Sequence, residues 1–323
     1  MYTTELKYFQ DLTHTAIVLT AAMLLLVTAC EEPFEPPFNE DRDEVVIESY
    51  IEWSPDTDFP SYAIVTRSFP FTAEIDPEFI SDLYIKDAEV SIFDGDKQVE
   101  LQLICSDDLP DAIRREIGTQ LGIDSFFINI CIYVDLMREL KIEPERNYEL
   151  KIEVDDRSFF SKTTIPRPVP LDSIWAAPAP NQGADSLAQL FLRLSDPAGP
   201  DYYRYFTSVN DGPLLPPLTS VTDDDIFDGQ QFDVAILKAE PRGTDFNPET
   251  FGYFKRGSKV QLKWCTLDED QFNFWETLEF SRNNQGPFSS YTLVDYNIEG
   301  EGGIGIFGSQ SCFYYTIEIP EEL

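Results

Sequence analysis

Short stretches of alternating apolar and polar residues, separated by turn-forming residues, recur along most of this chain. The clearest reads YELKIEV over Tyr148–Val154, and Asp155-Asp156-Arg157 separates it from a similar stretch at 159–164. Alternation places the apolar side chains on one face of a strand, and a short polar interval joins two strands as a hairpin. We therefore expect a mainly β protein built as sandwiches, with little helix.

Further segments rich in β-branched and aromatic residues are expected to form strands, and Asp94-Gly95 predicts a hairpin turn between two of them. Three prolines within 165–170 interrupt regular structure, because proline lacks a backbone donor. We therefore expect two β-sandwich-like domains, at 45–165 and 171–323. The further strands are expected at 45–53, 61–67, 89–93, 99–104, 126–134, 189–194, 203–209, 232–237, 260–266 and 312–319.

One short helix is expected in each domain. In the first, Pro110 stands near the start of 108–120, and Ile113 and Ile117 are one turn apart. In the second, Asp268 resembles an N-cap with Gln271 three residues later. The aromatic face of that second helix is expected to be core in preference to a ligand platform.

Near its start the chain has an apolar, uncharged stretch, Thr15–Ala29, which is followed directly by Cys30. It is too short to span a bilayer comfortably, which takes about 20 residues, and it is typical of a secretory signal. Val27-Thr28-Ala29-Cys30 resembles a lipobox, whose cysteine is acylated and becomes the new N-terminus. We expect a signal peptide at 1–29, lipidation of Cys30 and an acidic, proline-rich tether at 30–44. An uncleaved N-terminal anchor is the alternative.

Four cysteines remain after Cys30, and they allow three pairings. Pairing neighbours gives Cys105–Cys131 and Cys265–Cys312, one disulfide in each predicted domain. Oxidation is expected for an exported protein, and buried free thiols are the alternative. A thiolate metal site is disfavoured because no two cysteines have C-x-x-C spacing.

The charge and histidine content exclude several functions. The chain has 59 Asp and Glu against 23 Lys and Arg, a net charge of −36, so we expect no nucleic-acid partner. Its one histidine, His14, lies in the predicted signal peptide. Histidine-dependent triads and HExxH zinc sites are therefore excluded from the mature chain. We expect no enzyme; a carboxylate-based hydrolase is the least favoured alternative.

Two further segments stand out in the sequence, an acidic one that could bind a cation and a glycine-rich one. Asp223, Asp224, Asp225 and Asp228 precede Gly229 and offer the hard oxygens that Ca²⁺ prefers, but their spacing differs from an EF-hand. A turn with Gly229 in a left-handed conformation is the favoured alternative, so no cofactor is expected beyond a possible Ca²⁺ ion. The glycine-rich stretch 300–308 is expected to allow close backbone approach or bulges beside the last strand.

Several ordered motifs resemble a family of Bacteroidota outer-membrane lipoproteins of unknown function, encoded beside TonB-dependent receptors. The helix expected around 106–125 departs from this pattern. The motifs that carry the resemblance are Val27–Cys30, 45–53, Asp172-Ser173-Ile174, Tyr202-Tyr203, 223–230, Phe274-Trp275, Pro287-Phe288, Asn297-Ile298 and 303–308.

The resemblance implies a lipid-anchored binding or accessory protein, on the outer membrane and facing the cell exterior, that works with a TonB-dependent receptor in nutrient uptake. The 223–229 loop, Pro287, Phe288 and the glycines near 303–308 are the candidate partner surface. A structural subunit of an outer-membrane assembly, without its own ligand, is the alternative.

Overall fold

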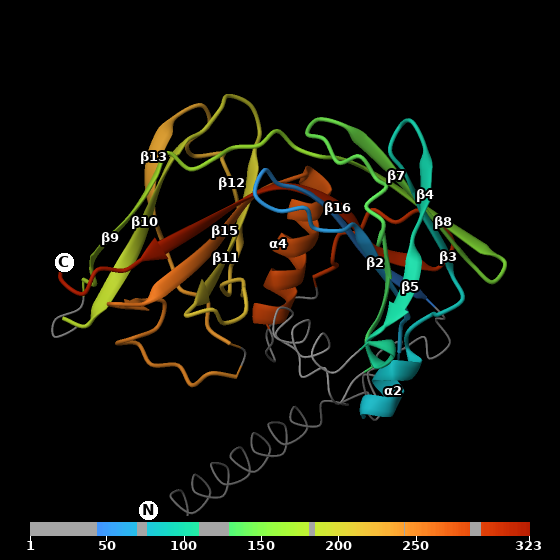
Figure 1. Cartoon of the computed structure of the whole chain (residues 1–323), viewed down its shortest axis with the longest axis horizontal. Coiled ribbons are helices and arrows are strands. Elements are labelled where there is room, and N and C mark those ends of the chain that lie inside the picture. Colours follow the sequence, from blue (N-terminus) through green and yellow to red (C-terminus); the bar gives the residue numbers. More distant parts are fainter. Residues whose placement is uncertain (1–43, 70–75, 110–128, 181–184, 242, 285–291) are drawn as a thin grey trace, which may run out of the picture. The chain divides into compact units, whose positions relative to one another are not determined.

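The computed structural model describes residues 44–69, 76–109, 129–180, 185–241, 243–284 and 292–323. Within these residues the protein is mainly β, with two α-helices and one 3₁₀ turn, as the sequence predicts (Figure 1). The elements are β1 (Val45–Trp53), β2 (Tyr62–Arg67), α2 (Pro77–Asp82), β3 (Glu89–Phe93), β4 (Gln98–Glu100), β5 (Gln102–Cys105), η1 (Ser106–Asp108), β6 (Cys131–Val134), β7 (Asn147–Val154), β8 (Arg157–Thr164), β9 (Ser173–Pro178), β10 (Leu187–Ser195), β11 (Tyr202–Val209), β12 (Val221–Asp223), β13 (Gln231–Ile236), β14 (Phe254–Lys255), β15 (Lys259–Leu267), α4 (Glu269–Asn283) and β16 (Gly303–Glu318).

A central sheet of eight strands organises the compact unit Arg42–Leu323. Its strand order is β12-β11-β15-β16-β1-β2-β6-β5. The last strand, β16, pairs antiparallel with β15 and parallel with β1, so the end of the chain joins its beginning (Figure 1). β16 is 16 residues long and includes the second part of the glycine-rich stretch 300–308. Its Gly303, Gly305 and Gly308 pair directly with residues of β1.

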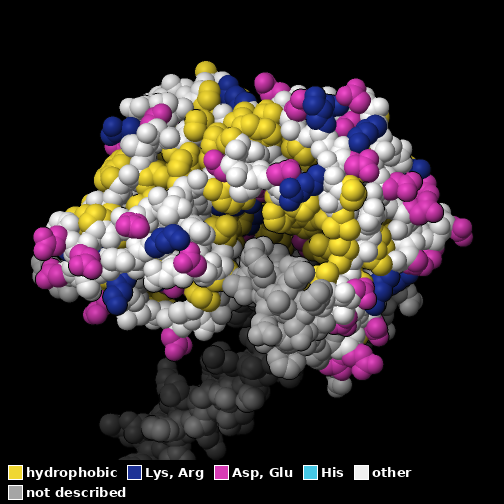
Figure 2. Space-filling view, in the orientation of Figure 1, with side chains coloured by type: hydrophobic (Ala, Val, Ile, Leu, Met, Phe, Trp, Pro, Cys, Tyr) yellow, Lys and Arg dark blue, Asp and Glu magenta, His cyan; other side chains and the backbone are white. Residues whose placement is uncertain are grey.

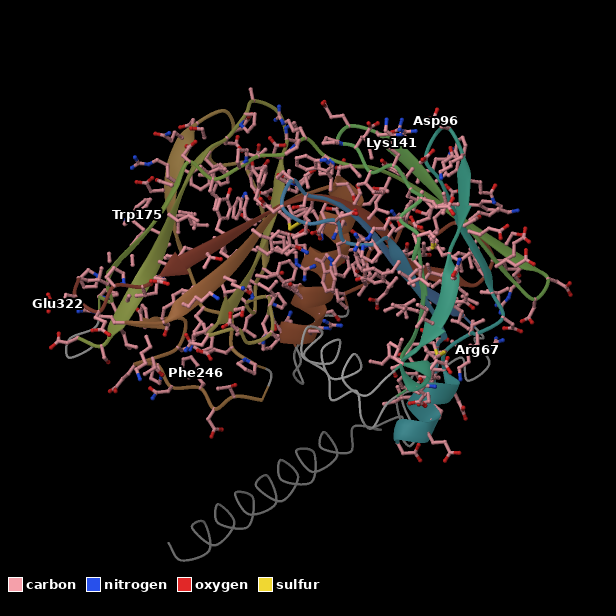
Figure 3. All side chains as sticks on the ribbon, viewed as in Figure 1. Arg67, Asp96, Lys141, Trp175, Phe246 and Glu322 are labelled. Atoms are coloured by element: carbon pink, nitrogen blue, oxygen red, sulfur yellow. A yellow bond between two sulfur atoms is a disulfide. The ribbon has the colours of Figure 1, made fainter. Side chains whose placement is uncertain are left out.

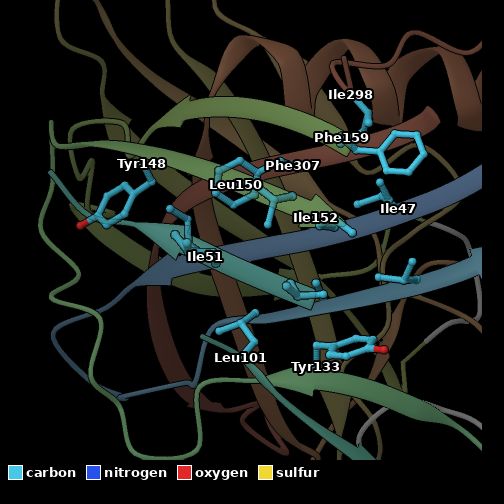
Figure 4. Packing of buried hydrophobic residues seen from close by; sticks show 14 of the residues in the cluster. Ile47, Ile51, Leu101, Tyr133, Tyr148, Leu150, Ile152, Phe159, Ile298 and Phe307 are labelled. Carbon is cyan, nitrogen blue, oxygen red and sulfur yellow. The ribbon is translucent and has the colours of Figure 1, made fainter. Parts of the chain in front are cut away.

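Two four-stranded sheets each share a hydrophobic cluster with strands of the central sheet. The sheet β4-β3-β7-β8 contributes Leu150 and Ile152 to a cluster that also holds Ile47 and Ile51 of β1 (Figure 4). The second sheet is formed by β9, β10, β13 and β14. Leu190, Leu192 and Leu194 of its β10 belong to a second hydrophobic cluster, which also contains residues of β11 and β15. Both arrangements are sandwich-like, because apolar faces of two sheets meet.

Both clusters use the same face of β16. Phe307 belongs to the first cluster, while Tyr315 and Ile317 pack against the second. These positions are an even number of residues apart, so their side chains leave the strand on one side. Residues before the sequence-based boundary at 165–171 form most of the first cluster and residues after it form the second. Ile298 and Phe307 nevertheless belong to the first cluster, and the central sheet crosses the boundary.

Helix α4 packs against the opposite face of the central sheet, over β16, β11 and β12. Asp268 caps its N-terminus, accepting a hydrogen bond from the backbone N–H of Gln271 at 2.9 Å, as predicted. Gly308 lies under this helix, and a Cβ added there would come within 2.8 Å of the Gln271 side chain. The glycine therefore permits the close approach of α4 to the sheet.

The first half contains one described α-helix that was not predicted from the sequence. This helix is α2, capped by Asp76, whose carboxylate accepts a hydrogen bond from Phe79 N at 2.8 Å. Asp76 followed by Pro77 is a local sequence signal for the start of this helix. The predicted helix at 108–120 lies almost entirely outside the described residues.

Both predicted disulfides are present in the structure. Cys105 pairs with Cys131 and Cys265 with Cys312, and in each pair the two residues lie directly opposite each other on antiparallel strands. The predicted signal peptide, the tether and Cys30 lie outside the described residues. No helix within the described ranges is long and apolar enough to cross a membrane.

Candidate binding site

The face of the central sheet that carries α4 contains a cluster of aromatic side chains around one buried arginine. We call Arg204, Trp275, Tyr50 and Tyr62 the arginine–aromatic cluster. Along β1, Tyr50 points to this face because it alternates with the core residues Ile47 and Ile51. Arg204 is on β11, Trp275 on α4 and Tyr62 on β2.

Arg204 is only 4% exposed, and its charge is stabilised by three kinds of contact. Its guanidinium carbon lies 3.7 Å from the centre of the Trp275 ring, a close cation–π geometry. Its Nε donates a hydrogen bond to Ser220 Oγ at 2.9 Å. Its terminal nitrogen is 3.8 Å from Glu279, which in turn accepts hydrogen bonds from Ser220. Burial nevertheless lowers the pKa of Arg204 to about 10.

The aromatic rings extend this cluster across the sheet. Tyr50 stacks on Trp275 with ring centres 6.5 Å apart, and its other neighbour, Tyr62, is 5.9 Å away. Burial, reinforced by the nearby Glu48, raises the pKa of Tyr50 well above its usual value. Burial likewise raises the pKa of Tyr62. Both phenols are therefore neutral hydrogen-bond donors at physiological pH.

Three buried polar atoms at the contact between α4 and the central sheet have no hydrogen-bond partner within the described chain. They are Tyr50 Oη, Trp275 Nε1 and Gln271 Oε1. A buried polar group without a partner costs about 1–3 kcal/mol, so such groups are rare unless water or a ligand satisfies them. Two of the three belong to rings of the arginine–aromatic cluster. The cluster therefore combines aromatic faces with hydrogen-bonding capacity that the described chain does not use, and it is the candidate site of this fold.

Apolar side chains are also visible on the surface of this unit. Figure 2 shows them over the middle of one face, while acidic side chains lie mostly toward its outer edges. A second aromatic pair lies elsewhere, on the outer side of the sheet that contains β9 and β10. There Trp175, labelled in Figure 3, stacks on Phe191 with ring centres 5.6 Å apart. The neighbouring Arg193 forms an ion pair with Asp233, so this pair of rings has a charged border.

The acidic loop predicted from the sequence divides into residues with different roles. Asp223 accepts a hydrogen bond from Asp225 N at 3.4 Å, and Asp228 accepts one from Gly199 N at 2.9 Å. Gly229 has φ +69°, the left-handed conformation expected of a turn. Asp224 alone turns inward, where it is 3% exposed.

Asp224 meets two aspartates that the sequence did not single out, Asp196 and Asp201. One carboxylate oxygen from each lies within 4.8 Å of the others, and all three residues are buried. Asp196 follows β10 and Asp201 precedes β11, so only the antiparallel return of the chain places them beside β12. No local pattern links the three residues, which explains why sequence reasoning missed two of them.

The remaining predicted partner residues, Pro287 and Phe288, lie outside the described residues. The glycines near 303–308 have a structural role that the structure shows directly. A Cβ added to Gly305 would stand 1.9 Å from the carbonyl oxygen of Ile47 on the paired strand. The expected close backbone approach is confirmed at this position.

The fold and these clusters define a disulfide-bonded, mainly β protein with a buried cationic and aromatic cluster. The chain matches, over residues 31–313, the family described as a domain of unknown function (DUF4249), and it belongs to that family. No curated protein matches the chain.

Proposed function

We propose that this protein is a lipid-anchored binding or accessory protein of the outer membrane, exposed to the cell exterior, that works with a TonB-dependent receptor in nutrient uptake. The lipid on Cys30 would hold it at the membrane, and residues 30–44 would act as the tether. The described domain would bind the nutrient or gate its access to the receptor.

The two disulfides support export of the chain. Cys105–Cys131 and Cys265–Cys312 are the kind of bond that persists in oxidising compartments and is rare in the cytosol. The apolar stretch Thr15–Ala29 before Cys30 supports a lipoprotein signal. A cysteine with two or three acyl chains would supply the stable anchoring that one chain lacks.

The single observation that carries the binding role is the arginine–aromatic cluster. Its Tyr50 hydroxyl and Trp275 N–H are buried donors without a partner in the described part of the chain. A purely structural cluster would be more stable with these atoms satisfied or absent. Aromatic faces beside free donors suit a ligand with a flat face and hydrogen-bond acceptors.

The test is a mild-detergent pull-down of the tagged protein from its own membranes, followed by mass spectrometry. Recovery of one large receptor in near-equal amount would support the accessory role. Recovery of this chain alone would contradict a stable receptor partner. A Cys30→Ser variant is the matched control, because it should lose the membrane fraction and the receptor together.

A further inference from the structure

Asp196, Asp201 and Asp224 form a buried group of carboxylates at one end of the central sheet. We call them the aspartate triad. They are 6%, 5% and 3% exposed, and their facing oxygens lie within 4.8 Å of one another. Three like charges at this distance repel strongly when water is excluded. The arrangement therefore needs a compensating positive charge.

The described residues supply only part of that charge. Arg167 binds Asp201 through two of its nitrogens, and this is the only ion pair that the triad makes within the described ranges. Three carboxylates and one guanidinium leave two negative charges. One divalent cation would neutralise them completely.

A second observation, on hydrogen bonding, also points to a cation. Asp224 Oδ2 is buried and has no hydrogen-bond partner in the described chain. The other members are held in place by contacts of their own: Asp196 accepts hydrogen bonds from the Tyr203 hydroxyl and from Gly229 N. An ionised carboxylate oxygen with neither water nor a partner is costly, so this oxygen is suited to coordinate a cation.

We propose that the aspartate triad binds one Ca²⁺ ion. The donor atoms are hard carboxylate oxygens, which Ca²⁺ prefers. Ca²⁺ accepts bonds of about 2.3–2.6 Å in flexible geometry, whereas Mg²⁺ demands a near-ideal octahedron at about 2.0–2.1 Å and gives up its water reluctantly. The facing oxygens of the triad, all within 4.8 Å of one another, are close enough to share one ion, and a set of protein carboxylates suits Ca²⁺ better than Mg²⁺.

A bound Ca²⁺ ion would join two separate segments of the chain. Asp196 and Asp201 lie in the loop between β10 and β11, and Asp224 directly follows β12, so the ion would clamp these two loops together.

The protein offers a built-in optical probe for the test. Tyr203 is hydrogen-bonded to Asp196 and stacks on Trp264 with ring centres 5.1 Å apart. Tb³⁺ replaces Ca²⁺ at carboxylate sites and emits light when nearby aromatic rings are excited. The full chain would be titrated with Tb³⁺ in about 0.15 M NaCl, where surface charges are screened beyond about 8 Å.

We expect one saturable Tb³⁺ site per chain, displaced by Ca²⁺ at least about tenfold more readily than by Mg²⁺. Saturating Ca²⁺ should raise the melting temperature by about 5 °C over the EDTA-treated protein. Asp224→Asn should lose at least about tenfold in Tb³⁺ and Ca²⁺ affinity. Asp225→Asn removes the same charge from an exposed neighbour and should bind like the wild type.

Three results would overturn a cation site at the triad. One is the absence of a saturable sensitised site in the wild type, a measurement that does not depend on how any variant folds. Another is equal loss of affinity in Asp224→Asn and Asp225→Asn. The third is a melting temperature that saturating Ca²⁺ leaves unchanged. Displacement of Tb³⁺ by Mg²⁺ as readily as by Ca²⁺ would overturn the assignment to Ca²⁺ in particular.

Discussion

The guanidinium carbon of Arg204 lies 3.7 Å from the centre of the Trp275 ring, so that a charge on β11 is held by a ring on α4. Glu279, on the same helix, contacts Arg204 on another side. Helix α4 therefore gains an electrostatic attachment to the central sheet in addition to its apolar contacts. This attachment makes the position of α4, and with it the arginine–aromatic cluster, sensitive to a single side chain.

Replacing Arg204 with methionine should destabilise the protein by about 3 kcal/mol, because breaking a buried charged pair leaves Glu279 without its cation. The measurement is the free energy of unfolding in urea. Arg193→Met is the matched control, since Arg193 pairs with Asp233 on the surface and should cost less than about 1 kcal/mol. An equal loss in the free energy of unfolding for the two variants would contradict the claim that burial makes the Arg204 contacts more important than the surface pair.

Replacing Tyr50 with phenylalanine removes a hydroxyl that has no partner in the described residues. We expect unchanged or slightly increased stability, because an unsatisfied buried polar group disappears. If the arginine–aromatic cluster binds the ligand or receptor, the same variant should lose receptor recovery in the pull-down. Tyr296→Phe is the control, because Tyr296 is 59% exposed. A clear loss of stability in Tyr50→Phe would show that the hydroxyl is structurally required.

Stability should depend on pH through Asp268. Burial raises the pKa of Asp268 from 3.8 to about 6, against hydrogen bonds from Ser309 and Gln271 that favour the charged form. The folded state therefore binds this proton more tightly than the unfolded state. The resulting stabilisation is complete below about pH 4 and is lost as the pH rises through 6.

The contribution of Asp268 should make the protein about 2 kcal/mol less stable at pH 7 than at pH 4. Urea unfolding of the wild type and Asp268→Asn across this range measures it. The difference between the two pH profiles is the relevant quantity, because the substitution also changes the cap of α4. Parallel profiles would show that Asp268 does not titrate in this range.

Replacing Gly305 with alanine should destabilise the fold by about 4 kcal/mol or more. The residue has φ +121°, and a Cβ would stand 1.9 Å from Ile47 O, so β16 and β1 would be forced apart. Gly243→Ala is the matched control: its φ is +81°, but a Cβ there would meet nothing within 4 Å. The control should cost only about 1 kcal/mol, the strain of the backbone conformation alone. Thermal or urea unfolding of both variants measures the two costs. The difference between them is the part that comes from the close contact with Ile47, because both variants share the backbone strain.

Local patterns predicted much of the secondary structure correctly. β1 spans Val45–Trp53, the range expected from its β-branched and aromatic residues, and the Asp94-Gly95 turn joins β3 to β4. Asp268 caps α4 at the predicted position. Each of these features depends on residues a few positions apart, whose preferences act whatever the rest of the chain does.

The sequence by itself determined the mainly β class, the hairpins and the cap of α4. It favoured the pairing of neighbouring cysteines, and the structure decided that pairing. Only the tertiary structure decided that β16 returns to pair with β1, because strand order depends on contacts between residues far apart in the chain. The same order brings Asp196, Asp201 and Asp224 together and places Arg204 over Trp275. Both candidate sites therefore arise from long-range contacts, since their side chains lie on separate strands, loops and α4 and meet only after the central sheet has formed.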